Sequence, residues 1–135
     1  MATAKDGRDI TKYSFDGGKP LPANNLVWTI VKDYVDKHPS ITFAELERVF
    51  PKELQGRNFG VVKKYTELTE GELGHTRQDG RPRFFINSEQ LIFLKEENIK
   101  VAVCTEWGKT GNNTNFLDFW KRMEELGYGD RVKEV

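Results

Sequence analysis

A change in the spacing of apolar residues along the chain is the feature that most constrains its fold. From residue 25 to about 68 apolar residues recur at helical spacing, and after about residue 70 they form short alternating runs. Helical spacing returns near residue 112. Chains that keep their helical and extended segments apart in this way are typical of the α+β class. We therefore expect helices, then an antiparallel hairpin sheet, then a C-terminal helix.

The first block predicts three helices. Asn25 stands before apolar residues at helical spacing, and Pro39 closes that pattern. Thr42-Phe-Ala-Glu45 is a capping box that opens a second helix. Residues 59–68 predict a shorter third helix.

The second block predicts strands. Three β-type runs lie at residues 83–86, 91–94 and 99–104, separated by turn-forming residues. Gln78-Asp79-Gly80-Arg81-Pro82 is expected to form a turn before the first run. The order of three short helices and a β-hairpin is that of a winged helix-turn-helix, in which the third helix enters the major groove and the hairpin forms the wing.

The last block predicts an amphipathic helix. Asn115, or Asn112 or Asn113 before it, can cap this helix, and Gly127 can end it. Trp107, in the turn that leads to the helix, is expected to pack against its apolar face. That face carries Phe116, Phe119, Trp120, Met123 and Leu126.

A length of 135 residues is typical of one domain with its own core. Residues 1–23 are expected to be a flexible N-terminal arm with one docked segment at Tyr13-Ser14-Phe15, and residues 24–130 a single winged-helix-like α+β domain. One cysteine excludes a disulfide framework. No apolar run approaches the roughly 20 residues that cross a bilayer, and the polar N-terminus is unlike a signal peptide. We expect a cytoplasmic protein with no membrane partner.

Nucleotide binding and catalysis are not predicted. Gly108-Lys109-Thr110 resembles the end of a P-loop, but Val103 stands where the earlier glycine is needed. Cys104 lies in an alternating apolar run, and the two histidines, His38 and His75, lie in polar, turn-like contexts without a nucleophile beside them. No spacing matches a metal-ligand cluster. We expect no enzyme, no cofactor and no metal.

The net charge of the chain is zero, because 21 basic residues balance 21 acidic ones, so any basic surface must be local. Basic residues exceed acidic ones between residues 52 and 66 and across the proposed wing. The sequence therefore predicts a duplex-DNA-binding module that makes few phosphate contacts and binds in a salt-sensitive way. The residues expected to contact DNA are Arg57, Asn58, Lys63, Lys64, Arg77, Arg81 and Arg83.

Two other interpretations remain open. Glu106, Trp107 and Asn112 or Asn113 could line an aromatic pocket, although Trp107 between a strand and an aromatic helix more often packs in a core. The zero net charge and the aromatic C-terminal helix also fit a protein-interaction or assembly module without direct DNA contact.

Much of the chain, residues 13 to about 128, also carries a family resemblance. The stretch LVWTIVKDYVDKHPSITFAELERVFPKELQG, the RFF strand, VAVCTEWG and GNNTNFLDFWKRMEELGY together resemble a small winged-helix-like domain of bacterial restriction and modification-dependent defence proteins. In that pattern an amide more often stands where Glu106 precedes Trp107, and the glycine-asparagine loop is shorter. The resemblance implies DNA association or accessory binding, with other defence proteins as further partners, rather than catalysis.

Overall fold

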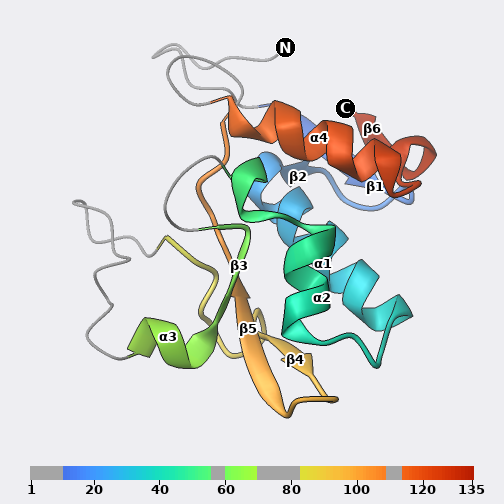
Figure 1. Ribbon diagram of the computed structural model, residues 1–135. Coiled ribbons are helices and arrows are strands. Elements are labelled where there is room, and N and C mark those ends of the chain that lie inside the picture. Colours follow the sequence, from blue (N-terminus) through green and yellow to red (C-terminus); the bar gives the residue numbers. More distant parts are fainter. Residues whose placement is uncertain (1–10, 56–59, 70–82, 109–113) are drawn as a thin grey trace.

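The computed structural model describes residues 11–55, 60–69, 83–108 and 114–135. Within these ranges the protein is an α+β structure with two small antiparallel sheets (Figure 1), which confirms the predicted class. No helix in them is long and apolar enough to cross a membrane. The α-helices of the described ranges are α1 Ala23–Lys37, α2 Phe43–Val49, α3 Tyr65–Thr69 and α4 Asn115–Glu125.

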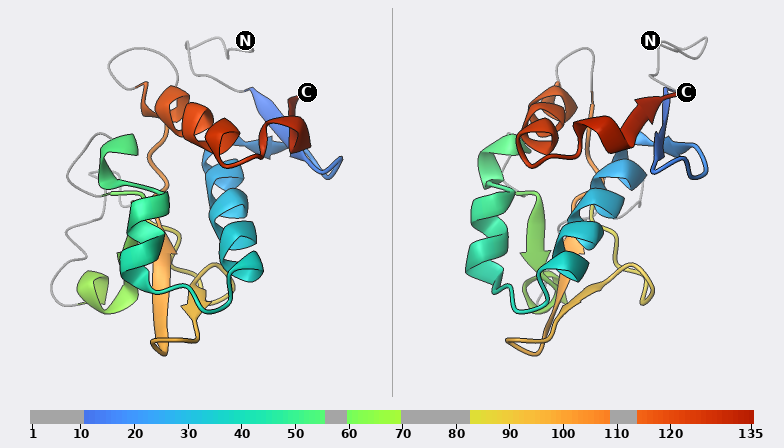
Figure 2. Two further views of the ribbon diagram at one scale, coloured as in Figure 1. Left: turned by 45° about the vertical axis from the view of Figure 1, so that its right-hand side comes forward. Right: turned by 90° about the vertical axis from the view of Figure 1, so that its right-hand side faces the viewer.

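The larger sheet has β5 (Ile99–Val103) at its centre, between β3 (Val62–Lys64) and β4 (Ile92–Leu94). Because side chains alternate along a strand, β5 has two different faces. Val101 and Val103 face the main core, where α1 and α2 stand beside the sheet (Figures 1 and 2). Ala102 and Cys104 face a smaller cluster that includes Leu68 of α3. The strands predicted near residues 91–94 and 99–104 are confirmed, and Phe84 of the run at 83–86 forms an isolated bridge to Cys104.

The predicted third helix is wrong for residues 62–64. These residues form β3, which pairs antiparallel with β5 through Val62 and Val103. The two valines at 61 and 62 are buried there, and β-branched residues favour a pleated surface over a helix. Helical structure begins only at Tyr65 and lasts five residues.

The smaller sheet joins two ends of the described chain. Its centre is β1 (Lys12–Phe15), with β2 (Leu21–Pro22) on one side and β6 (Val132–Glu134) on the other. Tyr13 is buried and lies 5.3 Å from the Phe116 ring, measured between centroids. The expected docking of residues 13–15 is confirmed. The folded unit includes residues 12–22, which the sequence assigned to the arm, and extends past residue 130 to β6.

Several polar contacts fix the helices against the sheet. The capping box of α2 is present, with Thr42 accepting from the Glu45 amide and Glu45 accepting from the Thr42 amide. The Phe43 amide also donates to Glu97 in the β4–β5 turn, at 2.6 Å. The α1 side chain Trp28 donates from its indole to the Gln90 carbonyl at 2.7 Å. Helix α1 begins at Ala23, so Asn25 lies inside it rather than capping it.

Helix α4 crosses the ends of α1 and α2 (Figure 2). Its apolar residues Phe116, Phe119 and Met123 are buried, as predicted from their spacing. Gly127 ends the helix at φ +93°, the Gly127 amide donates to the Glu124 carbonyl, and the Tyr128 amide donates to the Met123 carbonyl. This pair of hydrogen bonds is the Schellman motif.

Candidate nucleic-acid interface

A surface hollow of about 220 Å³ lies between α2 and β3. Phe43 and Phe50 line it from the α2 side, and residues 60–63 line it from the β3 side. Gly60 has φ +77°, a conformation that L side chains rarely adopt, so a glycine suits the point where the chain turns into β3. This turn brings β3 close to α2 and to Lys52.

Lys52 and Lys63 line this hollow, and the Lys64 ammonium lies over the ring of Phe43, which also lines it. We call these three residues, Lys52, Lys63 and Lys64, the lysine face. Lys52 belongs to the 3-10 helix η1 (Lys52–Leu54) and is exposed, whereas the two β3 lysines are half-buried. The Lys64 ammonium lies 5.3 Å from the centroid of the Phe43 ring, which restricts where that charge can be. Lys63 and Lys64, both predicted DNA contacts, are consecutive residues of β3.

Two acids share the hollow with these lysines. Glu47 of α2 and Glu67 of α3 both line it. Within the described part of the chain, Glu47, Glu67 and Lys52 form no ion pair. Neither acid was among the residues predicted from the sequence, although Glu47 follows Phe43 by one helical turn and so falls on the same side of α2. Their charge weakens the positive potential of the lysine face.

Arg83 lies apart from the lysine face and contacts a residue of the other predicted set. Its Nη1 is 3.1 Å from Oε2 of Glu106, and both side chains are largely buried. The bridge forms because residues 83–85 run beside the end of β5, with the Thr105 amide donating to the Arg83 carbonyl. The predicted phosphate contact Arg83 therefore already has a carboxylate partner.

A buried amide cluster holds the segment after β5. The Asn115 side chain donates to the carbonyls of Gln55 and Glu106 and accepts from the Gly108 amide. The Gln55 side chain is fully buried and donates to the Glu106 carbonyl at 3.3 Å. Asn115 thus joins three chain segments, which corrects its predicted role as a helix cap. Thr114 occupies the cap position, without a side-chain cap bond.

Trp107 packs as expected. Its ring lies 5.3 Å from the Phe119 ring, measured between centroids, and its indole donates to the Cys104 carbonyl at 2.8 Å. The side chain is half-buried against the main core. Neither Trp107 nor Glu106 lines the hollow between α2 and β3. The remaining predicted residues fall outside the described ranges: Arg57, Asn58, Arg77, Arg81, Asn112 and Asn113.

Cys104 is fully buried in the sheet. Burial raises the pKa of its thiol to about 12, so at neutral pH it is protonated and a poor nucleophile. Among the residues that the structure describes, no group of three or more His, Cys, Asp or Glu side chains could hold a metal ion.

The comparisons with known proteins add no assignment. No protein-family model, no curated protein and no solved structure matches the chain.

Proposed function

We propose that the protein is a non-enzymatic DNA-binding module of winged-helix-like arrangement, accessory to a bacterial restriction or defence system. The observation that carries the proposal is the lysine face, in which Lys52 and Lys63 line one hollow and Lys64 lies over its Phe43 wall. Lysine ammonium groups bind phosphate as point charges, and each contact releases condensed counterions from the duplex. The defence association rests on the family resemblance of the sequence.

In this proposal β3 takes the role that the sequence gave to a recognition helix. Helix α3 has five residues and so presents little more than one turn to a groove. The β3 lysines contact the phosphate backbone instead, which fixes position without reading bases. The proposed binding is therefore weak and has little sequence preference.

The two acids that line the hollow allow a second prediction about DNA affinity. Glu47 and Glu67 repel phosphate and lower the affinity of the lysine face. If this face binds DNA, neutralising the two acids strengthens binding.

The first experiment measures the anisotropy of a labelled short duplex across a salt series. For three phosphate contacts the slope of log K against log salt is about −2.7. Lys52→Gln, Lys63→Gln and Lys64→Gln together keep the aliphatic stems and remove the charges, so binding should fall and the slope should approach zero. Lys121→Gln with Lys133→Gln, on α4 and β6, is the control and should leave the slope unchanged.

The second experiment combines Glu47→Gln with Glu67→Gln and should increase affinity for the same duplex. Absence of any duplex binding by the unaltered protein at low salt would refute the proposal. Equal losses in the test and control lysine variants would also refute it, because binding would then follow net charge alone.

The alternative of an assembly module remains a prediction. Of the helix residues that suggested it, Phe116, Phe119 and Met123 are buried in the core, and Trp120 is partly exposed. Light scattering tests it directly, since a dimer would favour assembly and a monomer would count against it.

A further inference from the structure

A second hollow, of about 330 Å³, lies between the end of α1 and the start of α2. Tyr34, Ile41 and Val49 give it an apolar side, and His38 and Glu45 line its polar side. On α2, Glu45 and Val49 are one turn apart, as are Phe43 and Glu47, but the two pairs project in opposite directions. The second hollow is therefore separate from the lysine face.

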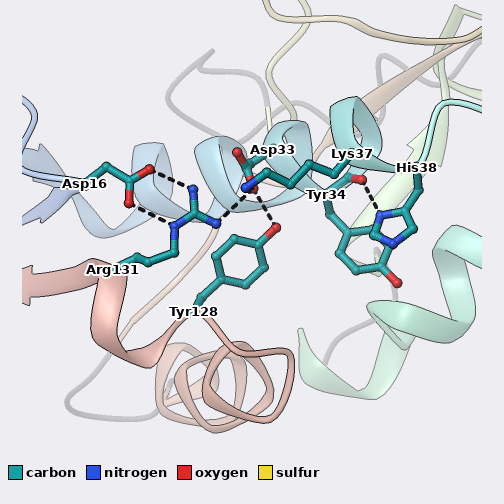
Figure 3. Close-up of polar contacts among 7 residues, drawn as sticks. All are labelled: Asp16, Asp33, Tyr34, Lys37, His38, Tyr128 and Arg131. Atoms are coloured by element: carbon teal, nitrogen blue, oxygen red, sulfur yellow. Dashed lines mark hydrogen bonds and ion pairs between the residues drawn. The ribbon is translucent and has the colours of Figure 1, made fainter.

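His38 presents a hydrogen-bond acceptor at this hollow. Its Nδ1 lies 2.8 Å from the Tyr34 carbonyl oxygen (Figure 3). A carbonyl can only accept, so Nδ1 carries the proton and Nε2 of the neutral ring has a lone pair. The ring is stacked on Tyr34, with centroids 4.0 Å apart and planes at 16°, and this contact fixes its orientation. Nε2 has no hydrogen-bond partner in the described ranges.

Glu45 supplies a second acceptor. Its Oε1 accepts from the Thr42 amide and hydroxyl, both at 3.0 Å, whereas Oε2 has no partner among the described residues. The hydrogen bond from the Thr42 backbone holds the pKa of Glu45 below its usual 4.5, so the carboxylate is charged at neutral pH. The capping box thus holds the carboxylate in place and leaves one oxygen available.

The surroundings of the hollow favour positive charge. Among the residues that the structure describes, no lysine or arginine lines it. Arg48, three residues after Glu45, donates from Nε to the Ala44 carbonyl. The hollow lies at the C-terminal end of the 15-residue helix α1, where exposed carbonyls give a partial negative charge. A negatively charged ligand would meet Glu45 and this helix end together.

We propose that this hollow binds an organic cation, an ammonium or guanidinium group on an apolar body. The apolar body lies against Tyr34, Ile41 and Val49, and the cationic group donates hydrogen bonds to Oε2 of Glu45 and to Nε2 of His38. A charge-assisted hydrogen bond and contact with an aromatic side chain are the two interactions that such cations use. This site goes beyond the proposed DNA contact and does not depend on it.

The test measures binding of benzamidine by calorimetry, with neutral benzamide as the ligand of the same shape. Benzamidine should bind and benzamide should bind much more weakly. Glu45→Gln keeps an oxygen that can complete the capping box and removes the charge, so benzamidine affinity should fall about tenfold. Glu47→Gln, on the other side of α2, is the matched control and should leave the affinity unchanged.

His38→Phe keeps a ring to stack on Tyr34 and removes the acceptor, so it should also weaken binding. Thermal unfolding of each variant checks that the fold is intact. A second arm compares agmatine, a free small molecule with a guanidinium and an amine, with a blocked arginine amide, which represents a peptide side chain. Tighter binding of agmatine would indicate a free small molecule as the natural ligand, and tighter binding of the arginine amide would indicate a protein side chain. Either result supports the site. Equal affinities for benzamidine and benzamide, or an unchanged affinity in Glu45→Gln, would overturn the proposal.

Discussion

Arg131 and Asp16 form a two-point ion pair, in which Nε lies 2.8 Å from Oδ1 and Nη2 lies 2.7 Å from Oδ2 (Figure 3). Asp16 follows β1, and Arg131 ends the 3-10 helix η3 (Gly129–Arg131) before β6. Nη1 of Arg131 also lies 3.5 Å from Asp33 of α1, which accepts from the Tyr128 hydroxyl at 2.7 Å. The smaller sheet is therefore tied to α1 through charged side chains.

This network predicts that stability falls in acid. The Arg131 hydrogen bonds lower the pKa of Asp16 below 3.8. Burial alone would raise the pKa of Asp33, but hydrogen bonds from Tyr128 and Lys37 and the charge of Arg131 outweigh it and lower the pKa below 3.8. Groups with a lowered folded pKa stabilise the fold above the unfolded pKa, and this stability is lost as pH falls through the folded pKa. Urea unfolding at a series of pH values below about 5 should show the decline.

Asp33→Asn is the matched variant for that experiment. It should be less stable than the unaltered protein at neutral pH, and its stability should change less steeply with pH in the acid range. Parallel pH profiles for the two proteins would contradict a role for Asp33.

Trp107→Ala should lower the free energy of unfolding by about 2–3 kcal/mol, because the half-buried ring leaves a gap beside Phe119. The thermal midpoint should fall by roughly 10 °C for a chain of this size. Trp107→Phe keeps an aromatic ring and removes only the bond to the Cys104 carbonyl, so it should cost about 1 kcal/mol. An unchanged midpoint in the alanine variant would show that Trp107 does not pack.

Gly127→Ala should destabilise the protein by about 1 kcal/mol, measured by urea unfolding. A Cβ at Gly127 would meet no atom within 4 Å, so the cost comes from the backbone at φ +93° alone. Gly129→Ala is the control, because its Cβ would make ordinary contact with Glu124 at 3.5 Å and its backbone carries no such strain. Equal effects of the two substitutions would contradict this explanation.

Cys104 should react with a thiol reagent only when the protein opens. The burial that raises its thiol pKa to about 12 also keeps the reagent away. At mildly alkaline pH the native protein should react far more slowly than the same protein in concentrated urea. Rapid labelling of the native protein would mean that the sheet around Ala102 and Cys104 opens easily.

Local patterns in the sequence were sufficient for several elements. Thr42 and Glu45 marked the start of α2, and the spacing of Phe116, Phe119 and Met123 marked the buried face of α4. These signals lie within a few residues of one another, so they do not depend on the rest of the fold.

Features set by distant parts of the chain could not be predicted in the same way. Val62 becomes a strand residue because it pairs with Val103, far along the chain. The Arg83–Glu106 bridge likewise depends on two segments running side by side at the end of β5. Propensity over a short window holds no information about such partners, and pairing overrides it. Glu47 and Glu67 lie outside the basic stretch at residues 52–66, and only the fold brings them to the hollow beside the lysines.

Tyr13 in β1 pairs with Glu134 in β6, so the first and the last strand of the described chain lie side by side. Residues paired across antiparallel strands are about 5 Å apart. In a longer polypeptide, the segment that leads into β1 and the segment that follows β6 would therefore start from neighbouring points on the surface of this unit. The unit is thus suited to insertion as a cassette, in place of a single surface turn of a host protein, with little displacement of the flanking segments.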